Sequence, residues 1–482
     1  MVTPVRILRP KKRIAATFLL CVVIFSLFSA CTSMRRLKKH YAKTDKAVSK
    51  SNYLEAAALV KSEKEKSYKK RDRVLYYLNL GMLHHFAGKY AESNRLLTIA
   101  ENAIETLFTK SISKAAVSLL LNDTVLDYSG EDYEDIYINV FKALNYLNMG
   151  NFDEAFVEVR RIDIKLSILE NKYKKLSGGY NRSKDNITSI RPGRNRFFND
   201  ALGRYLSLLL YRAEGDFDNA RIDMEKIREA FKNQKTAYNF PVPESINHNP
   251  EADSTKLTVL SFAGRIPDKK AFTVRITTLK NAIVLTVLNE NKKFQNELKA
   301  FQALYFKGIK GGYNFKFQLP YIKPEGSKID SIALIIDGEK VAELEKLESL
   351  ENIALETFRV KKPVIYTKTI VRTIVKGVLA GTAANKASES MEKKYGNSGW
   401  LAGLATKILA SVAVDISEKA DLRMGHFFPA YAYVSEIEIT PGIHSLSIDY
   451  YNKSGDLVFS DFKGNIEIKK GDLNLYESFY LR

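Results

Sequence analysis

A group of acidic residues between positions 123 and 135 could bind a metal ion. The carboxylates are Asp123, Asp127, Glu131, Asp132, Glu134 and Asp135. They lack the D-x-D-x-D-G spacing with which one loop supplies the ligands of calcium. Gly130-Glu131-Asp132 instead precedes an apolar segment, and carboxylates at the start of a helix are stabilised by its unpaired N–H groups and its dipole. The pattern therefore favours a helix N-terminus over a cation site, and we expect no bound metal.

The sequence carries none of the short motifs that mark common catalytic sites. The six histidines are scattered, and no H-E-x-x-H, G-x-S-x-G or G-x-x-x-x-G-K-[ST] occurs. A pair of carboxylates for glycoside hydrolysis leaves no characteristic spacing, so that chemistry stays open. We therefore expect no enzymatic activity and no cofactor.

Both cysteines of the chain lie near its N-terminus, Cys21 within an apolar run and Cys31 at the end of it. Five basic residues precede the run, and small residues close it. A basic start, a short apolar core and small residues are the pattern of a secretory signal peptide. The run is also near the shortest that crosses a bilayer, so an uncleaved membrane anchor is one alternative and a secreted soluble protein is another.

The segment Phe28-Ser29-Ala30-Cys31 resembles the lipobox of bacterial lipoproteins. That resemblance implies cleavage before the cysteine, whose thiol then carries a diacylglycerol. Residues 1–30 would be the lipoprotein signal peptide, and residues 31–46 a basic tether. Cys31 is thus the expected lipidation site, which leaves the mature chain with no free thiol. We expect a lipid-anchored protein of the bacterial cell envelope, attached to the outer membrane where the host has two.

The formal net charge of +20 indicates an anionic partner or surface. Export makes nucleic acid improbable, so anionic lipid or an acidic glycan is the candidate partner. The basic residues after Cys31 would also attract an anionic membrane surface. Lysines that only solvate helix faces are the alternative.

Residues 47–236 have the apolar spacing of helices, and one short phrase recurs in them. A small residue is followed by a polar one, an aromatic, two spacers and then Ala or Ser. The four copies are SNYLEAAALV from 51, GKYAESNRLL from 88, GNFDEAFVEV from 150 and GDFDNARIDM from 215. The phrase resembles the turn of the tetratricopeptide repeat, and this resemblance implies stacked helical hairpins with an extended binding groove. A generic helical bundle is the alternative.

Three segments give the chain a wider resemblance, to an uncharacterised family of bacterial repeat-containing lipoproteins. They are residues 122–161, SFAGRIPDKK from 261, and ADLRMGHFFPAYAYVSEIEITPGIHSLSI from 420. The family implies an architecture and a location in the cell envelope, and no activity.

If helices before each turn line a groove, residues just before Gly150 and Gly215 are candidates for contact with a partner protein. These are Asn145, Tyr146, Tyr211 and Arg212. The tyrosines could equally pack within their own hairpins. We expect Asn145 and Arg212 to be exposed, so that replacing them leaves stability nearly unchanged.

The period of the apolar residues changes from helical to alternating after a proline-rich segment at 237–254. We expect a linker there, a first β-rich part over 255–360, a helical insertion over 361–420 and antiparallel strands over 421–482. Lys368, Arg372 and Lys376 lie four residues apart in the insertion, opposite an apolar face. The insertion is expected to be a helical pair packed on a sheet, and a membrane-inserting hairpin is the alternative.

The predicted fold class is therefore α+β. An N-terminal helical-repeat domain precedes a β-rich, sandwich-like domain that contains an inserted helical pair. The function that fits best is a lipid-anchored scaffold or adaptor, which binds an envelope protein in its helical groove. The alternative is a binder of acidic glycan or anionic lipid through the basic β-rich module.

Overall fold

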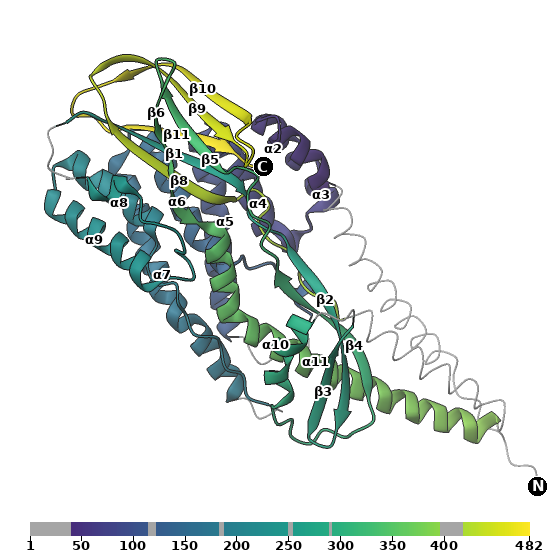
Figure 1. Ribbon diagram of the computed structural model, residues 1–482. Coiled ribbons are helices and arrows are strands. Elements are labelled where there is room, and N and C mark those ends of the chain that lie inside the picture. The colour runs from purple at the N-terminus through teal and green to yellow at the C-terminus, as the bar shows by residue number, and fades with distance from the viewer. Residues whose placement is uncertain (1–39, 114–121, 183–187, 249–253, 289–291, 396–417) are drawn as a thin grey trace, which may run out of the picture.

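The computed structural model describes residues 40–113, 122–182, 188–248, 254–288, 292–395 and 418–482. It confirms an α+β protein, in which a helical region precedes β-rich sheets with an inserted long helix (Figure 1). Residues 1–39, with the expected signal peptide and Cys31, lie outside the described part, and so does the expected second inserted helix at 399–416.

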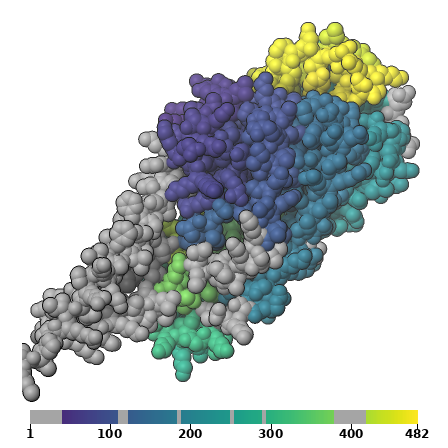
Figure 2. Space-filling model, turned by 180° about the vertical axis from the view of Figure 1, so that it is seen from behind, coloured from purple at the N-terminus to yellow at the C-terminus, as the bar shows by residue number. Residues whose placement is uncertain are grey.

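The helical region consists of consecutive antiparallel helices, and Figure 2 shows them side by side in sequence order, from purple to teal. Residues 40–48 are helical and precede the first complete element. The elements that follow are α2 (Tyr53–Ser62), α3 (Lys64–Ser67), α4 (Arg73–Phe86), α5 (Tyr90–Ser113), α6 (Asp132–Asn148), α7 (Phe152–Asn181), α8 (Ala201–Glu214) and α9 (Phe217–Asn233). Helices α4 and α5, α6 and α7, and α8 and α9 pack as hairpins.

The small residue of each recurring phrase lies in the turn between two helices. Ser51, Gly88, Gly150 and Gly215 have positive φ angles of 54°, 66°, 73° and 76°. Glycine adopts this left-handed conformation without steric penalty, which is why it so often ends a helix. The recurring phrase thus marks tight turns between helices.

Two four-stranded sheets pack face to face in the β-rich part. The first has the order β11-β1-β8-β7 and the second β10-β9-β5-β6. Their strands are β1 (Lys256–Arg265), β5 (Ser331–Ile336), β6 (Glu339–Glu343), β7 (Glu345–Ser349), β8 (Pro429–Glu438), β9 (Gly442–Tyr451), β10 (Leu457–Ile468) and β11 (Asn474–Tyr480). Leu257 and Val259 of the first sheet share a core with Leu334 and Ile448 of the second. Strands before and after the inserted helix therefore build one sandwich, in which β1 and β11 form a parallel pair.

A third sheet, β3-β2-β4, lies at the other end of the molecule from the second sheet (Figure 1). It consists of β2 (Lys269–Leu279), β3 (Ala282–Val287) and β4 (Asn314–Ile322), and α10 (Lys292–Gln302) follows β3. The alternation of apolar residues at 271–279 and 315–322 predicts strands of the sandwich-like domain. They separate from it because Val274 and Phe317 form their own core with Ile370 and Ile374 of the inserted helix.

The inserted helix, α11 (Leu350–Tyr395), begins before residue 361, so the expected boundary at 360 is wrong. Ile353, Ala354 and Phe358 are buried at helical spacing, which extends the helix toward β7. Pro363 lies within the helix. Among the described residues, no helix is both long and apolar enough to span a bilayer.

The helical region and the first sheet share one hydrophobic core. The ring of Phe141 in α6 lies 5.4 Å from that of Phe262 in β1, whose ring stacks on Phe479 of β11 at 5.8 Å. Strand β1 is buried on both faces, because helices cover one face of its sheet and the second sheet covers the other. The described part is thus layered as helices, sheet and sheet.

The segment expected to be a linker is anchored over its described part, residues 237–248. Tyr238 is buried, and its hydroxyl donates to Glu348 at 2.9 Å and accepts from the backbone N–H of Ala201 at 2.8 Å. The prolines end the helical region as expected, yet the segment packs between α8 and β7.

Gly377 of α11 allows this helix to approach β4 closely, because a side-chain carbon at this position would overlap the ring of Phe315. Gly377→Ala should therefore lower the free energy of unfolding by about 1–3 kcal/mol, the usual cost of overpacking. Chemical denaturation measures this change. Gly178→Ala is the matched control, since the nearest atom to its new carbon would lie at 3.5 Å. Gly178→Ala should stabilise α7 slightly. Equal stability changes in the two variants would contradict the close approach of Gly377 to Phe315.

Candidate functional site

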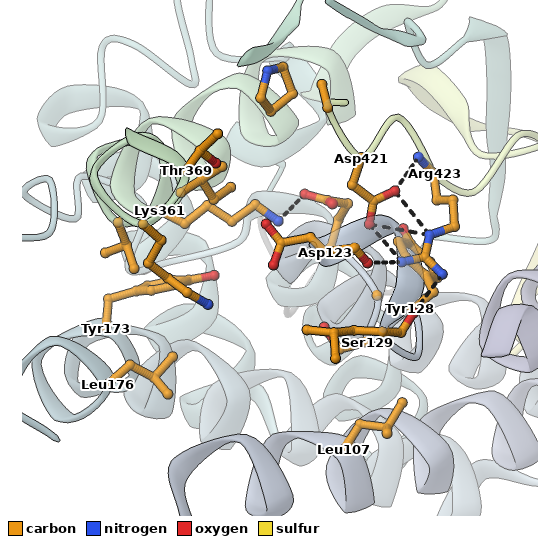
Figure 3. Close-up of a pocket in the computed structure, with 18 of the residues that line it drawn as sticks. Leu107, Asp123, Tyr128, Ser129, Tyr173, Leu176, Lys361, Thr369, Asp421 and Arg423 are labelled. Carbon is orange, nitrogen blue, oxygen red and sulfur yellow. Dashed lines mark hydrogen bonds and ion pairs between the residues drawn. The ribbon is translucent and has the colours of Figure 1, made fainter. Parts of the chain in front are cut away.

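A cavity of about 550 Å³ lies between the helical region and α11 (Figure 3). Its walls come from α5, α7, α11, the segment before α6 and the segment before β8. One part of the lining is apolar and consists of Leu107, Phe108, Leu126, Leu176, Ile190, Pro320, Val364, Ile365 and Ala420. The charged part consists of Asp123, Asp127, Glu131, Lys172, Lys269, Lys361, Lys368, Arg372, Lys419, Asp421 and Arg423. The cavity is therefore amphipathic.

The carboxylate of Glu131 joins three elements at the wall of this cavity. It forms ion pairs with Lys269 of β2 and Lys361 of α11, and all three side chains are buried. Burial alone would lower the pKa of Lys361, but the carboxylates of Glu131 and Asp132 outweigh it and hold that pKa above its ordinary value. The Lys361 ammonium thus stays charged, and the two ion pairs of Glu131 fix the start of α6 against the inserted helix.

Glu131 and Glu134 also form the N-terminal capping box of α6, which confirms the expected helix cap. The carboxylate of Glu134 accepts from the backbone N–H of Glu131 at 2.9 Å and from the hydroxyl of Tyr128 at 2.8 Å. Burial, and then the charge of Glu131, raise the pKa of Glu134 to about 7. Gly425 donates its backbone N–H to the same carboxylate, so the cap extends to the segment before β8.

Arg423 fixes the opposite wall. Its guanidinium contacts Asp421 at 2.8 Å and Asp72 at 2.9 Å, and it donates to the backbone carbonyls of Leu126 and Asp123. The group also lies over the ring of Tyr128, 5.4 Å from its centre. These contacts saturate the guanidinium, so it serves to hold the walls together.

The three segments that carry the family resemblance meet at this site. The first segment supplies the cap of α6 with residues 122–134. The second segment supplies Lys269, which pairs with Glu131, and the third supplies Arg423 and Gly425. These residues are far apart in the chain, and no sequence spacing indicates that they converge.

Two buried or half-buried polar side chains of the lining are unpaired within the described part of the chain. The hydroxyl of Tyr180 is buried and has no hydrogen-bond partner there. Burial raises the pKa of Tyr180 to about 12, so the hydroxyl keeps its proton and can donate it in a hydrogen bond. The half-buried Lys368 makes no ion pair or hydrogen bond with the described residues.

The arrangement is suited to binding. Ligand pockets of about 300–1,000 Å³ are typically apolar, with a few polar groups that orient the ligand. Among the residues that the structure describes, no group of three or more His, Cys, Asp or Glu side chains could hold a metal ion. The acidic cluster of the sequence is instead distributed over the α6 cap and over ion pairs with lysines and arginines.

Two of the predicted partner-binding residues are not on an exposed surface. Asn145 is fully buried; its side-chain carbonyl oxygen accepts from Nδ1 of His85 at 2.7 Å, and its amide nitrogen donates to Ser93 and Asn94. Arg212 forms an ion pair with Glu436 of β8 at 2.7 Å, with a side chain only 11% exposed. The expected exposure of both is wrong, because the first sheet and the neighbouring helices cover this side of the hairpins.

The two tyrosines of that prediction lie within the helical layer. Tyr146 and Tyr211 are partly buried against the main core. The ring of Tyr211 lies 5.0 Å from that of Phe156 in the neighbouring hairpin. Their contact with a partner protein stays a prediction, as does lipidation of Cys31, which lies outside the described residues.

Comparison with models of protein families finds no match, and neither a curated protein nor a solved structure matches the chain. The resemblance to the bacterial lipoprotein family therefore stays a prediction.

Replacing Asn145 should destabilise the protein. Asn145→Ala leaves polar groups of His85, Ser93 and Asn94 without their partner in the core, so we expect a loss of about 2–3 kcal/mol in the free energy of unfolding. Asn465→Ala, at an exposed position of β10, is the control and should change stability by less than about 0.5 kcal/mol. Thermal and chemical denaturation measure both, and a neutral Asn145→Ala would restore the surface assignment.

Proposed function

We propose that this protein is a lipid-anchored, non-catalytic binding protein of the bacterial cell envelope, which holds its ligand in the cavity between the helical region and α11. The observation that carries the proposal is the amphipathic cavity itself, whose size is within the range of pockets that enclose a small molecule. The ion pairs of Glu131 and Arg423 keep its walls in place, as a preformed site requires.

The start of the described chain supports a site close to the membrane. Tyr41 stacks on His426 with ring centres 3.8 Å apart, and Asp45 contacts both Arg265 and His426. Residues 32–39 connect Cys31 to this point, so they can extend over at most about 30 Å. A lipid on Cys31 would hold this part of the protein near the bilayer, and His426 is close in sequence to Arg423 at the cavity.

A protein partner on the helical region is the second candidate. We propose that the hairpins with recurring turns are tetratricopeptide-like. One of their helices, α7, also exposes apolar side chains. Val157, Ile164 and Ile168 are 47%, 57% and 46% exposed, and their spacing places them on one helix face. Exposed apolar side chains that form a stripe are typical of surfaces that bind proteins.

Lipidation at Cys31 can be tested directly. Metabolic labelling with a palmitate analogue should mark the full chain and should not mark Cys31→Ser, because only the thiol accepts the diacylglycerol. Washed membranes should retain the full chain and release the variant. Equal labelling of the two would contradict the anchor, and labelling of Cys21→Ser should be unchanged.

The use of the cavity can be tested with a bulky substitution. Leu176→Trp in the lining should reduce the affinity for the uncharged fluorescent probe N-phenyl-1-naphthylamine about tenfold or more, because the larger ring occupies the space of the probe. Leu457→Trp, at a position of β10 that is 54% exposed, is the matched control and should bind the probe with the affinity of the unsubstituted protein. Fluorescence titration measures both, and equal affinities in all three proteins would contradict binding in the cavity.

A further inference from the structure

The basic stripe of α11, formed by Lys368, Arg372 and Lys376, has one member without an ionic partner in the described part of the chain. Arg372 and Lys376 both pair with Glu418, at 2.8 Å and 2.7 Å. Lys368, one turn earlier, lines the cavity and has no ionic partner among the described residues. These three side chains share one stripe of the helix, as their spacing predicts, and they reach the cavity and a buried carboxylate.

The other lysines of the cavity wall are occupied. Lys269 and Lys361 share Glu131, and Lys172 pairs with Asp132 at 2.6 Å. Over the whole described lining, seven Lys or Arg side chains face four Asp or Glu side chains. The lining therefore favours an anion, and the charge that remains available is that of Lys368.

The Tyr180 hydroxyl is a second, independent indication of a ligand. The side chain is 3% exposed, and the hydroxyl lacks a partner within the described residues. Burying a hydroxyl without a hydrogen bond costs free energy, so native structures almost always pair it. Because Tyr180 lines the same cavity as Lys368, a ligand oxygen can accept from it.

The apolar part of the lining indicates which kind of group the ligand carries beside its anionic group. Leu107, Leu126, Leu176 and Ile190 offer apolar surface, which suits an aliphatic chain and does not suit a glycan rich in hydroxyl groups. The volume of about 550 Å³ is that of a site for one small ligand.

We propose that the cavity binds an amphiphile with one aliphatic chain and a single anionic head group, a carboxylate or a phosphate. Lys368 provides the positive charge for the head group, and the hydroxyl of Tyr180 donates a hydrogen bond to a ligand oxygen. This inference rests on the proposed function, because it names the ligand class of the same cavity.

The probes for the test differ only in their head groups. Displacement of N-phenyl-1-naphthylamine from the full chain is measured with palmitate, hexadecyl phosphate, hexadecanol, hexadecyltrimethylammonium and inorganic phosphate, all below micellar concentration. Palmitate and hexadecyl phosphate should displace the probe at least about tenfold more effectively than hexadecanol, since an ion pair or charged hydrogen bond contributes about 1.4 kcal/mol or more. Their ranking relative to each other distinguishes a fatty acid from a phosphate-bearing lipid as the source of the head group.

Substitutions at Lys368 and Tyr180 test whether these two residues bind the head group. Lys368→Gln and Tyr180→Phe should each weaken the anionic amphiphiles about tenfold and leave hexadecanol unchanged. Lys368→Arg should keep the preference for anions, whereas Lys368→Glu should transfer it to hexadecyltrimethylammonium. Lys299→Gln on the exposed face of α10 and Tyr305→Phe, 64% exposed, are the matched controls. Thermal unfolding of each variant shows whether it is folded.

The outcomes separate this inference from the proposed function. Equal displacement by all single-chain amphiphiles, with no effect of the Lys368 and Tyr180 variants, would overturn the anionic class and leave a binding cavity. Displacement by inorganic phosphate as strong as that by hexadecyl phosphate would overturn the amphiphile. If the neutral probe binds equally well to Leu176→Trp, the proposed function itself fails.

Discussion

The ion pairs of Glu131 are the constraint on which the arrangement of the molecule depends. One carboxylate holds Lys269 of the third sheet and Lys361 of α11, and the same residue caps α6. Ions buried in this way need opposite charges and hydrogen bonds, because desolvation otherwise outweighs their attraction. The fold therefore brings helices, sheet and inserted helix to a common point, and removal of any one of them leaves a buried charge.

The cavity is a consequence of this junction. Helix α11 is held against the start of α6 by Lys361 and against β4 by the core around Phe317 and Ile370. The space beside it is lined by apolar side chains of α5 and α7 and by Lys368 and Arg372 of α11 itself. Figure 3 shows Lys361 and Thr369 on one side of this space and Leu107 and Leu176 on the other. A helix held at two points can thus leave a preformed site between them.

The shared core limits how the helical region can bind a partner. Phe141 packs on Phe262 of β1, and Arg212 pairs with Glu436 of β8, so the sheet occupies the side of the hairpins that a groove would offer near these residues. A protein partner would therefore find this part of the hairpins already covered by the sheet. Val157, Ile164 and Ile168 of α7 stay exposed and form the surface that suits the proposed protein partner.

The sequence by itself determined what depends on local spacing. The turns at Gly88, Gly150 and Gly215, the change from helical to alternating period, and the cap formed by Glu131 and Glu134 follow from residues within a few positions of one another. Local conformational preferences and helix-end chemistry act over that distance, so one stretch of chain is enough to recognise them. The resemblance of residues 28–31 to a lipobox has the same local character.

Tertiary structure alone decided which polar residues are buried, paired or available. Asn145 has the spacing of a groove residue, but it is in the core because the preceding hairpin packs against it and bonds it through His85, Ser93 and Asn94. Lys368, Arg372 and Lys376 are equivalent in the sequence, and only the position of Glu418 distinguishes the paired members from Lys368. Periodicity indicates which face of an element is polar, whereas the charge balance of a site depends on groups that the fold brings together from distant segments.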